Sequence, residues 1–166
     1  TETVARLSSR ARRTRVVTVP SNHGQWRTSR GRDGQAGRPG DDFGIDVHRA
    51  VADAFALAGR DVSWLIPDPW TESLAIEVVP GFVLGVVHGH QWRPGRAADW
   101  WRGQSLGDGP TAAAHMLVHG HLHHAELQTA GFLDNRPRWI LQADALDGGS
   151  SWFTNLTGDA GEPSLT

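Results

Sequence analysis

Three apolar segments of this chain lead into asparagine or histidine, and this arrangement constrains the fold more than any other feature. The segments span residues 15–19, 82–87 and 115–118, and they have the apolar character of buried strands. The polar residues that follow them are Asn22-His23, His88 with His90, and His121 with His123. Because loops at strand ends gather at one rim of a mixed α/β sheet, we expect these side chains to converge.

The regions around these segments alternate between helical and strand patterns. Apolar residues repeat at helical spacing from Phe43 to Ala58, with Asp41-Asp42 as an N-cap before them and Gly59 as a stop signal after them. A second helix is expected over residues 96–104, and residues 1–14 have the pattern of the end of an amphipathic helix. Residues 74–79 and 82–87 predict a hairpin, and residues 138–143 and 151–155 predict further strands. The chain is therefore predicted to be α/β.

Composition narrows the class of protein. The chain has 166 residues, of which 39% are hydrophobic and 20% charged, which suits a single domain over residues 1–166. Its net charge of -2 argues against a general polycation, and the absence of cysteine excludes disulfides and thiolate ligands. No apolar run approaches the roughly 20 residues that span a bilayer, so we expect a soluble, cytoplasmic protein without a membrane partner. Because the chain begins with Thr1, we expect it to be part of a longer protein.

Taken in order, the polar residues resemble the second half of the calcineurin-like metallophosphoesterase signature. The matching elements are Asn22-His23, the isolated His88, and Gly120-His121-Leu122-His123. Residues 146–153 also look like the segment that follows the last motif in some phage and bacterial relatives. The resemblance implies part of a four-layered α/β/β/α sandwich, in which helices flank mixed sheets. The resemblance covers only the C-terminal portion of that domain, because the family's first two motifs have no place before Thr1.

The resemblance also implies a site for hydrolysis of phosphate monoesters or diesters, with nucleic acid and nucleotides among the candidate substrates. In the family, two divalent ions clamp the attacking and leaving oxygens. Asn22, His88 and His121 would ligate one ion and His123 the other, whereas His23 would contact the phosphate and protonate the leaving oxygen. Imidazole and amide or carboxylate oxygens suit Mn, Fe, Ni or Zn rather than Ca. The glycine before His121 is expected to let the backbone turn sharply.

Other residues near these motifs have weaker assignments. His90 lies two residues after His88, and it is a candidate for substrate contact or for support of the ligands, as are Trp26 and Arg27. Arg27 belongs to a basic, glycine-rich stretch that is either a solvated loop or a lid over an anionic substrate. His115 and His119 are expected to be structural. Asp46-Val47-His48 is expected to be helix surface, because residues two apart in a helix point about 200° away from each other.

Two departures from the family pattern limit what this chain can do. It lacks the motifs that supply the bridging carboxylate, so we expect this chain alone to be inactive and to bind one ion where the intact protein binds two. Gly24 stands where the family usually has an acidic residue, which leaves His23 without that partner unless Asp41 or Asp42 supplies one. The alternative is a non-catalytic domain with a structural or single-metal histidine site.

Overall fold

The computed structural model describes residues 2–26, 37–145, 154–155 and 158. The chain forms two compact units, Thr1–Leu74 and Ala75–Thr166. The described residues contain three helices and seven strands, which confirms the predicted α/β class. None of the described helices is both long enough and apolar enough to cross a membrane. The assignment of residues 1–166 to one domain stays a prediction.

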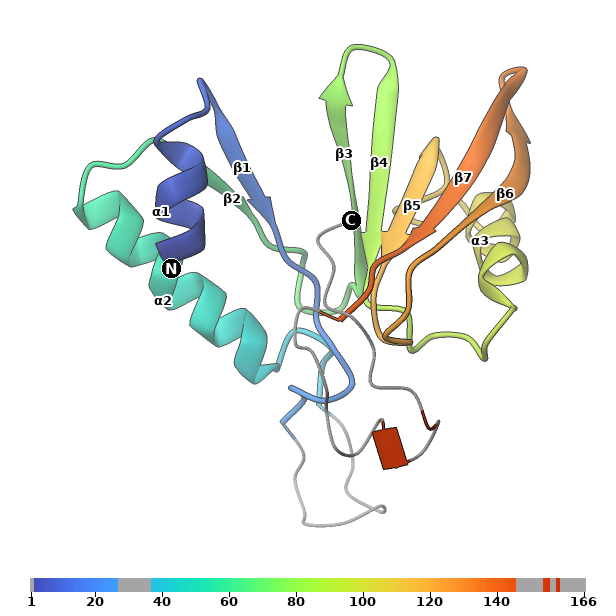
Figure 1. Cartoon of the computed structure of the whole chain (residues 1–166), viewed down its shortest axis with the longest axis horizontal. Coiled ribbons are helices and arrows are strands. Elements are labelled where there is room, and N and C mark those ends of the chain that lie inside the picture. The colour runs from blue at the N-terminus through green and yellow to red at the C-terminus, as the bar shows by residue number, and fades with distance from the viewer. Residues whose placement is uncertain (1, 27–36, 146–153, 156–157, 159–166) are drawn as a thin grey trace. The chain divides into compact units, whose positions relative to one another are not determined.

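The first unit combines two parallel strands with two helices (Figure 1). Its elements are α1 (Glu2–Ser8), β1 (Thr14–Val17), α2 (Phe43–Leu57) and β2 (Val62–Leu65). β1 and β2 pair in parallel from Thr14 opposite Val62 to Val17 opposite Leu65. β2 was not predicted from the sequence, and α1 ends well before the predicted residue 14.

Helix α2 starts where the sequence predicts, but it buries a different face: Ile45 and Phe55 are buried, whereas Phe43 and Val47 of the predicted apolar stripe are 60% and 44% exposed. Its N-cap is Asp42, whose Oδ1 accepts a hydrogen bond from the backbone N–H of Ile45 at 3.0 Å. Phe55 on the buried face meets Trp64 of β2 edge-on, with ring centroids 5.9 Å apart. His48 also lies against Trp64 at 5.8 Å, while Asp46 is exposed, so the Asp46-Val47-His48 segment is part of the helix as expected.

The second unit contains most of a five-stranded mixed sheet with the order β3-β4-β5-β7-β6 (Figure 1). The elements are β3 (Ser73–Val79), β4 (Phe82–Val87), α3 (Ala97–Leu106), β5 (Met116–His119), β6 (Glu126–Leu133) and β7 (Arg136–Gln142). β4, β5 and β7 run parallel to one another, and β6 is antiparallel to β7. The predicted pair of strands around Pro80-Gly81 is confirmed, whereas β6 was not predicted.

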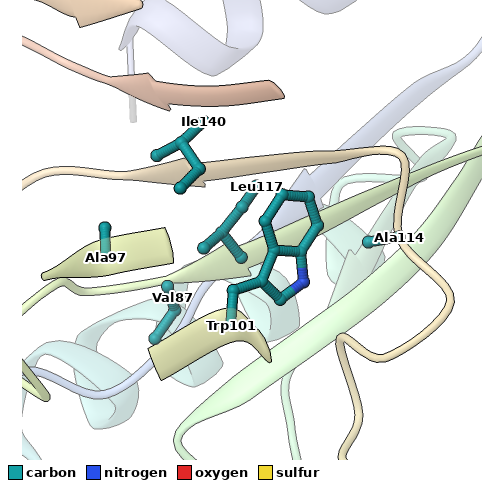
Figure 2. Close-up of a cluster of buried hydrophobic side chains, with 6 residues drawn as sticks. All are labelled: Val87, Ala97, Trp101, Ala114, Leu117 and Ile140. Carbon is teal, nitrogen blue, oxygen red and sulfur yellow. The ribbon is translucent and has the colours of Figure 1, made fainter. Parts of the chain in front are cut away.

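A hydrophobic core joins α3 to this sheet (Figure 2). Trp101 of α3 is 1% exposed and lies against Leu117 of β5 and Ile140 of β7, which are both fully buried. The indole N–H of Trp101 donates to the carbonyl oxygen of Thr111 at 2.9 Å, so its polar atom is satisfied inside the core. Trp92, which is partly buried, packs against the edge of this core.

Candidate histidine site

The ends of β4 and β5 bring two of the predicted ligand loops side by side. The strands are parallel, with Leu84 opposite Met116 and Val86 opposite Val118. The alignment continues past the strands, because the backbone N–H of Gly120 donates to the carbonyl oxygen of His88 at 3.0 Å. The register of one strand pair therefore sets His88 beside the Gly120-His121 step, as the convergence of strand ends predicts.

Three imidazole rings meet at this edge of the sheet. The centroids of His88 and His121 are 4.9 Å apart, and those of His88 and His90 are 5.4 Å apart. The rings of His90 and His121 lie 6.3 Å apart. All three side chains are half-buried. The structure thus brings His88 and His121 together and adds His90 to them.

Gly89 makes this close approach possible. Its φ of +112° lies in a region that side chains rarely adopt, and a Cβ there would be 2.8 Å from Nδ1 of His119 and 2.9 Å from the carbonyl oxygen of Gly120. A side chain at this position would push the loop that carries His88 and His90 away from the loop that carries His121. Glycine is therefore required between the first two histidines.

The backbone after β5 is strained at the predicted ligands themselves. His121 has a φ of 74° and His123 a φ of 58°, both in the left-handed region. For a residue with a side chain this conformation costs on the order of 1–3 kcal/mol, and such strain gathers at functional sites. The expectation that Gly120 provides the turn is wrong, since Gly120 is not among the residues with positive φ. The two histidines take the unusual conformation themselves.

His119 supports this loop from inside the protein. It is 3% exposed, its Nδ1 donates to the carbonyl oxygen of Gly120 at 2.9 Å, and its ring meets Trp92 edge-on at 4.9 Å. Burial lowers the pKa of His119, and its hydrogen bond to Gly120 partly offsets that shift. Gln142 holds the far end of the loop by donating to the carbonyl oxygen of His124 at 2.7 Å. His119 is therefore structural, as predicted.

His115, at the other end of β5, is also structural. Its Nδ1 accepts a hydrogen bond from the backbone N–H of Val83 at 3.1 Å, and its ring stacks on Phe82 at 5.5 Å. These contacts tie the start of β5 to β4, far along the strands from the histidine loops.

The loop that carries Asn22 and His23 belongs to the first unit, and it is anchored by Asp42. The Asp42 carboxylate is 2% exposed, and its Oδ2 accepts from the backbone N–H of Ser21 at 3.0 Å and from the Ser21 hydroxyl at 3.3 Å. The Ser21 hydroxyl oxygen in turn accepts from the backbone N–H of Gly24 at 3.0 Å. Asn22 is half-buried and His23 is exposed. Their roles as ligand and proton donor stay predictions.

The close approach of Asp42 explains why residue 24 is glycine. A Cβ at Gly24 would lie 2.5 Å from Oδ2 and 2.6 Å from Oδ1 of Asp42. An acidic side chain of the kind that the family carries there could not fit without displacing this buried carboxylate. In this chain a carboxylate from α2 lies directly beside the residue that follows His23, where the family would place one from the loop itself.

The remaining candidate residues are either exposed or outside the described part of the chain. His123 is exposed, and Trp26 is 55% exposed, with its indole N–H donating to Asp46 at 3.2 Å and its ring edge-on to Phe43. Arg27 and residues 146–153 lie outside the described residues. Of the strand predicted over residues 151–155, the described residues 154–155 are helical, so the prediction is wrong there.

The ring spacing allows His88 and His121 to share an ion. With metal–nitrogen bonds of about 2.0–2.1 Å, two imidazoles on one ion have centroids about 4.5–5.3 Å apart for bond angles near 90–110°. The separation of 4.9 Å between His88 and His121 falls within that range, and the 6.3 Å between His90 and His121 exceeds it. Across the part of the chain that the structure describes, no group of three or more histidine, aspartate or glutamate residues could hold a metal ion. The donors present fit a pair of ligands and fall short of a complete set.

Comparison with solved structures finds several chains with a similar fold. No protein-family model matches the chain, and no curated protein matches it in sequence. A crystal structure of a single mutant of Vps29 from Entamoeba histolytica is similar, with a TM-score of 0.48 and 18% sequence identity, covering 98% of this chain and 72% of that chain. Vps29 has the calcineurin-like metallophosphoesterase fold.

Proposed function

We propose that the chain is the C-terminal portion of a metal-dependent phosphoesterase of the calcineurin-like type found in phages and bacteria. The observation that supports this most is the 4.9 Å pairing of the His88 and His121 rings at the ends of neighbouring parallel strands. These two histidines are the ones that the motif resemblance assigns to a single ion. Their donors suit Mn, Fe, Ni or Zn. A location in the cytoplasm stays part of the prediction.

Each residue of the proposed site has a definite task. A bound divalent ion would polarise a phosphoryl oxygen and orient the ester. His88 and His121 would hold it through a backbone arrangement that Gly89 and the strained loop fix in advance. His90, whose ring is 5.4 Å from that of His88, would orient that ligand or contact the ester. His23 would donate a proton to the leaving oxygen, a role that imidazole fills near neutral pH.

The remaining ligands in the proposal come from the resemblance. Asn22 would complete the first ion's ligands and His123 would bind the second ion, while upstream motifs would supply the bridging carboxylate. Phosphate monoesters, phosphodiesters, nucleotides and nucleic acid are all candidate substrates. Arg27 and Trp26, which follow His23 closely in sequence, are candidates for binding them.

A second candidate is a non-catalytic domain in which the histidines bind one ion for structure. It rests on the same pairing of His88 and His121, which would bind one ion without the other parts of a catalytic site. In this case the strain at His121 and His123 would serve metal binding without hydrolysis.

The test uses the protein as its gene encodes it. Metal content and hydrolysis of bis(p-nitrophenyl) phosphate are measured for the wild type, His123→Ala, His23→Ala and the control His124→Ala, which changes an exposed histidine of the same loop. We expect His123→Ala to lose metal, and His23→Ala to keep metal while turnover falls by about 10²–10⁴-fold. Equal metal content and equal rates in all four proteins would rule out the phosphoesterase. Metal binding without hydrolysis in the wild type would support the second candidate.

A further inference from the structure

A cavity of about 440 Å³ lies between α3, which lines it from Ala98 to Leu106, and residues 129–132 of β6 in the second unit. Its volume is in the range of small-molecule sites, about 300–1,000 Å³. None of the histidines discussed above lines it. It is therefore a separate feature of the molecule, and its interpretation does not depend on the proposed function.

An irregularity in β6 forms one wall of this cavity. Thr129 pairs with Trp139 and Phe132 pairs with Pro137, so β6 has one more residue than β7 over this stretch. The extra residue is accommodated at Gly131, whose φ is +91°. Such β-bulges bend a strand and redirect its side chains, and they occur often beside binding sites. The bulge is a specific feature of the strand that opens space next to α3.

A buried guanidinium lies at the inner end of the cavity. Arg138 of β7 is 6% exposed, and its guanidinium carbon is 3.6 Å from the ring centroid of Trp101. Its Nε donates to Ala114 O at 3.0 Å, its Nη2 to Ala112 O at 3.0 Å and Thr111 O at 3.5 Å, and its Nη1 to the Ser105 hydroxyl at 2.7 Å. A guanidinium has five N–H donors, so one donor of Nη1 is left over beside Ser105, which also lines the cavity.

The charge of Arg138 is not neutralised by the rest of the described chain. Its hydrogen-bond acceptors are carbonyl and hydroxyl oxygens, and no carboxylate in residues 2–26 or 37–145 forms an ion pair with it. Burial lowers the pKa of Arg138, but arginine stays charged at neutral pH. The second cation on the cavity wall, Arg102, pairs with Asp99 on the outside of α3, and no acidic residue lines the cavity. The cavity is therefore electropositive.

The outer rim of the cavity is apolar. Leu106 at the end of α3 is 85% exposed, and Phe132 of β6 is 76% exposed. A positive inner end and an apolar rim suit a ligand with one anionic group and an apolar body. We propose that this cavity binds a small amphipathic carboxylate, whose carboxylate accepts from the remaining Nη1 donor of Arg138 and whose apolar part lies between Leu106 and Phe132.

The test compares octanoate with 1-octanol by isothermal titration calorimetry on the full chain. Octanoate is expected to bind with a stoichiometry of one and to shift the amide NMR signals of Ser105 and Gly131. Octanol, which has the same apolar body without the charge, is expected to bind at least about tenfold more weakly, because it lacks the charge-assisted hydrogen bond.

A rim variant tests the location without touching the buried arginine, whose replacement could unfold the protein. Leu106→Glu places a negative charge at the cavity mouth and is expected to weaken octanoate binding about tenfold or more. The matched control is Leu57→Glu, which changes a 91% exposed leucine at the end of α2 and is expected to leave binding unchanged. The proposal is overturned if octanoate shows no saturable binding, if octanol binds equally well, or if both glutamate variants behave alike.

Discussion

Replacing Asp42 by alanine is expected to destabilise the first unit by about 2–4 kcal/mol. Loss of an N-cap costs about 0.5–2 kcal/mol, and a buried backbone donor left without an acceptor costs about 1–3 kcal/mol. Both costs apply here, because Oδ1 caps Ile45 at 3.0 Å and Oδ2 holds the backbone N–H of the half-buried Ser21 at 3.0 Å, for which the lower part of the second range applies. The Asp42 carboxylate thus connects the start of α2 to the Asn22-His23 loop through hydrogen bonds.

The Asp42→Asn variant separates the contribution of the N-cap to stability from that of the hydrogen bond to Ser21. Its single oxygen serves as an N-cap as well as that of aspartate, so the bond to Ile45 is expected to survive. Its NH₂ group would then face the backbone N–H of Ser21, and two donors cannot bond to each other. We expect Asp42→Asn to lose about 1–3 kcal/mol, all of it from the loop.

The assay is urea unfolding followed by circular dichroism, together with amide hydrogen exchange. Asp42→Ala should speed exchange at both Ser21 and Ile45, whereas Asp42→Asn should speed it mainly at Ser21. Asp53→Asn, on the exposed side of the same helix, should stay within about 0.5 kcal/mol of the wild type. If Asp42→Ala also stays within that margin, or if exchange at Ser21 is unchanged, the anchoring role assigned to Asp42 is wrong.

Three further predictions test the packing and the charges. Gly89→Ala should destabilise the protein more than Gly95→Ala in thermal unfolding. Both glycines have positive φ, but only Gly89 has atoms within 4 Å of the added Cβ. Equal losses of stability in the two variants would show that crowding at Gly89 has no effect. Leu117→Ala in the fully buried core should cost about 2–5 kcal/mol in urea unfolding, and a loss below 1 kcal/mol would contradict the packing. Arg38 lowers the pKa of the Asp41 carboxyl, chiefly through its side-chain hydrogen bond, so Arg38→Gln should raise that pKa in an NMR titration; an unchanged pKa would show that the pair does not persist in solution.

The parts of the fold that follow from local sequence were predictable. Helix α2 combines a regular apolar stripe with an aspartate cap, and Pro80-Gly81 separates two clear strands. β6 could not be predicted, because it is an edge strand with Leu127 and Phe132 exposed, and its bulge at Gly131 breaks the alternation that identifies strands. β2 is as short as β1 and β5, which were predicted, but its sequence Val62-Ser63-Trp64-Leu65 is interrupted by a polar residue and does not lead into asparagine or histidine.

The histidine site was predictable in its members and less so in its geometry. The motif spacing and the parallel strand ends identified His88 and His121, whose rings do meet. The turn was assigned to Gly120 because glycine adopts positive φ most easily, yet tertiary contacts impose that conformation on His121 and His123. β5 also begins and ends one residue later than predicted, which places His119 inside the sheet. The burial of Arg138 could have been predicted from the sequence, because it lies on the same face of β7 as the buried Ile140 and Gln142, two and four residues further along the strand.

The most direct test of the central claim is the affinity of the full chain for Zn²⁺, measured for the wild type, His88→Ala, His121→Ala and the double variant. If the two rings share an ion, each single variant should weaken binding at least about tenfold, and the double variant should be little worse than either, because the first loss already breaks the pair. Wild-type affinity in both single variants would contradict the account, as would losses that simply add in the double variant.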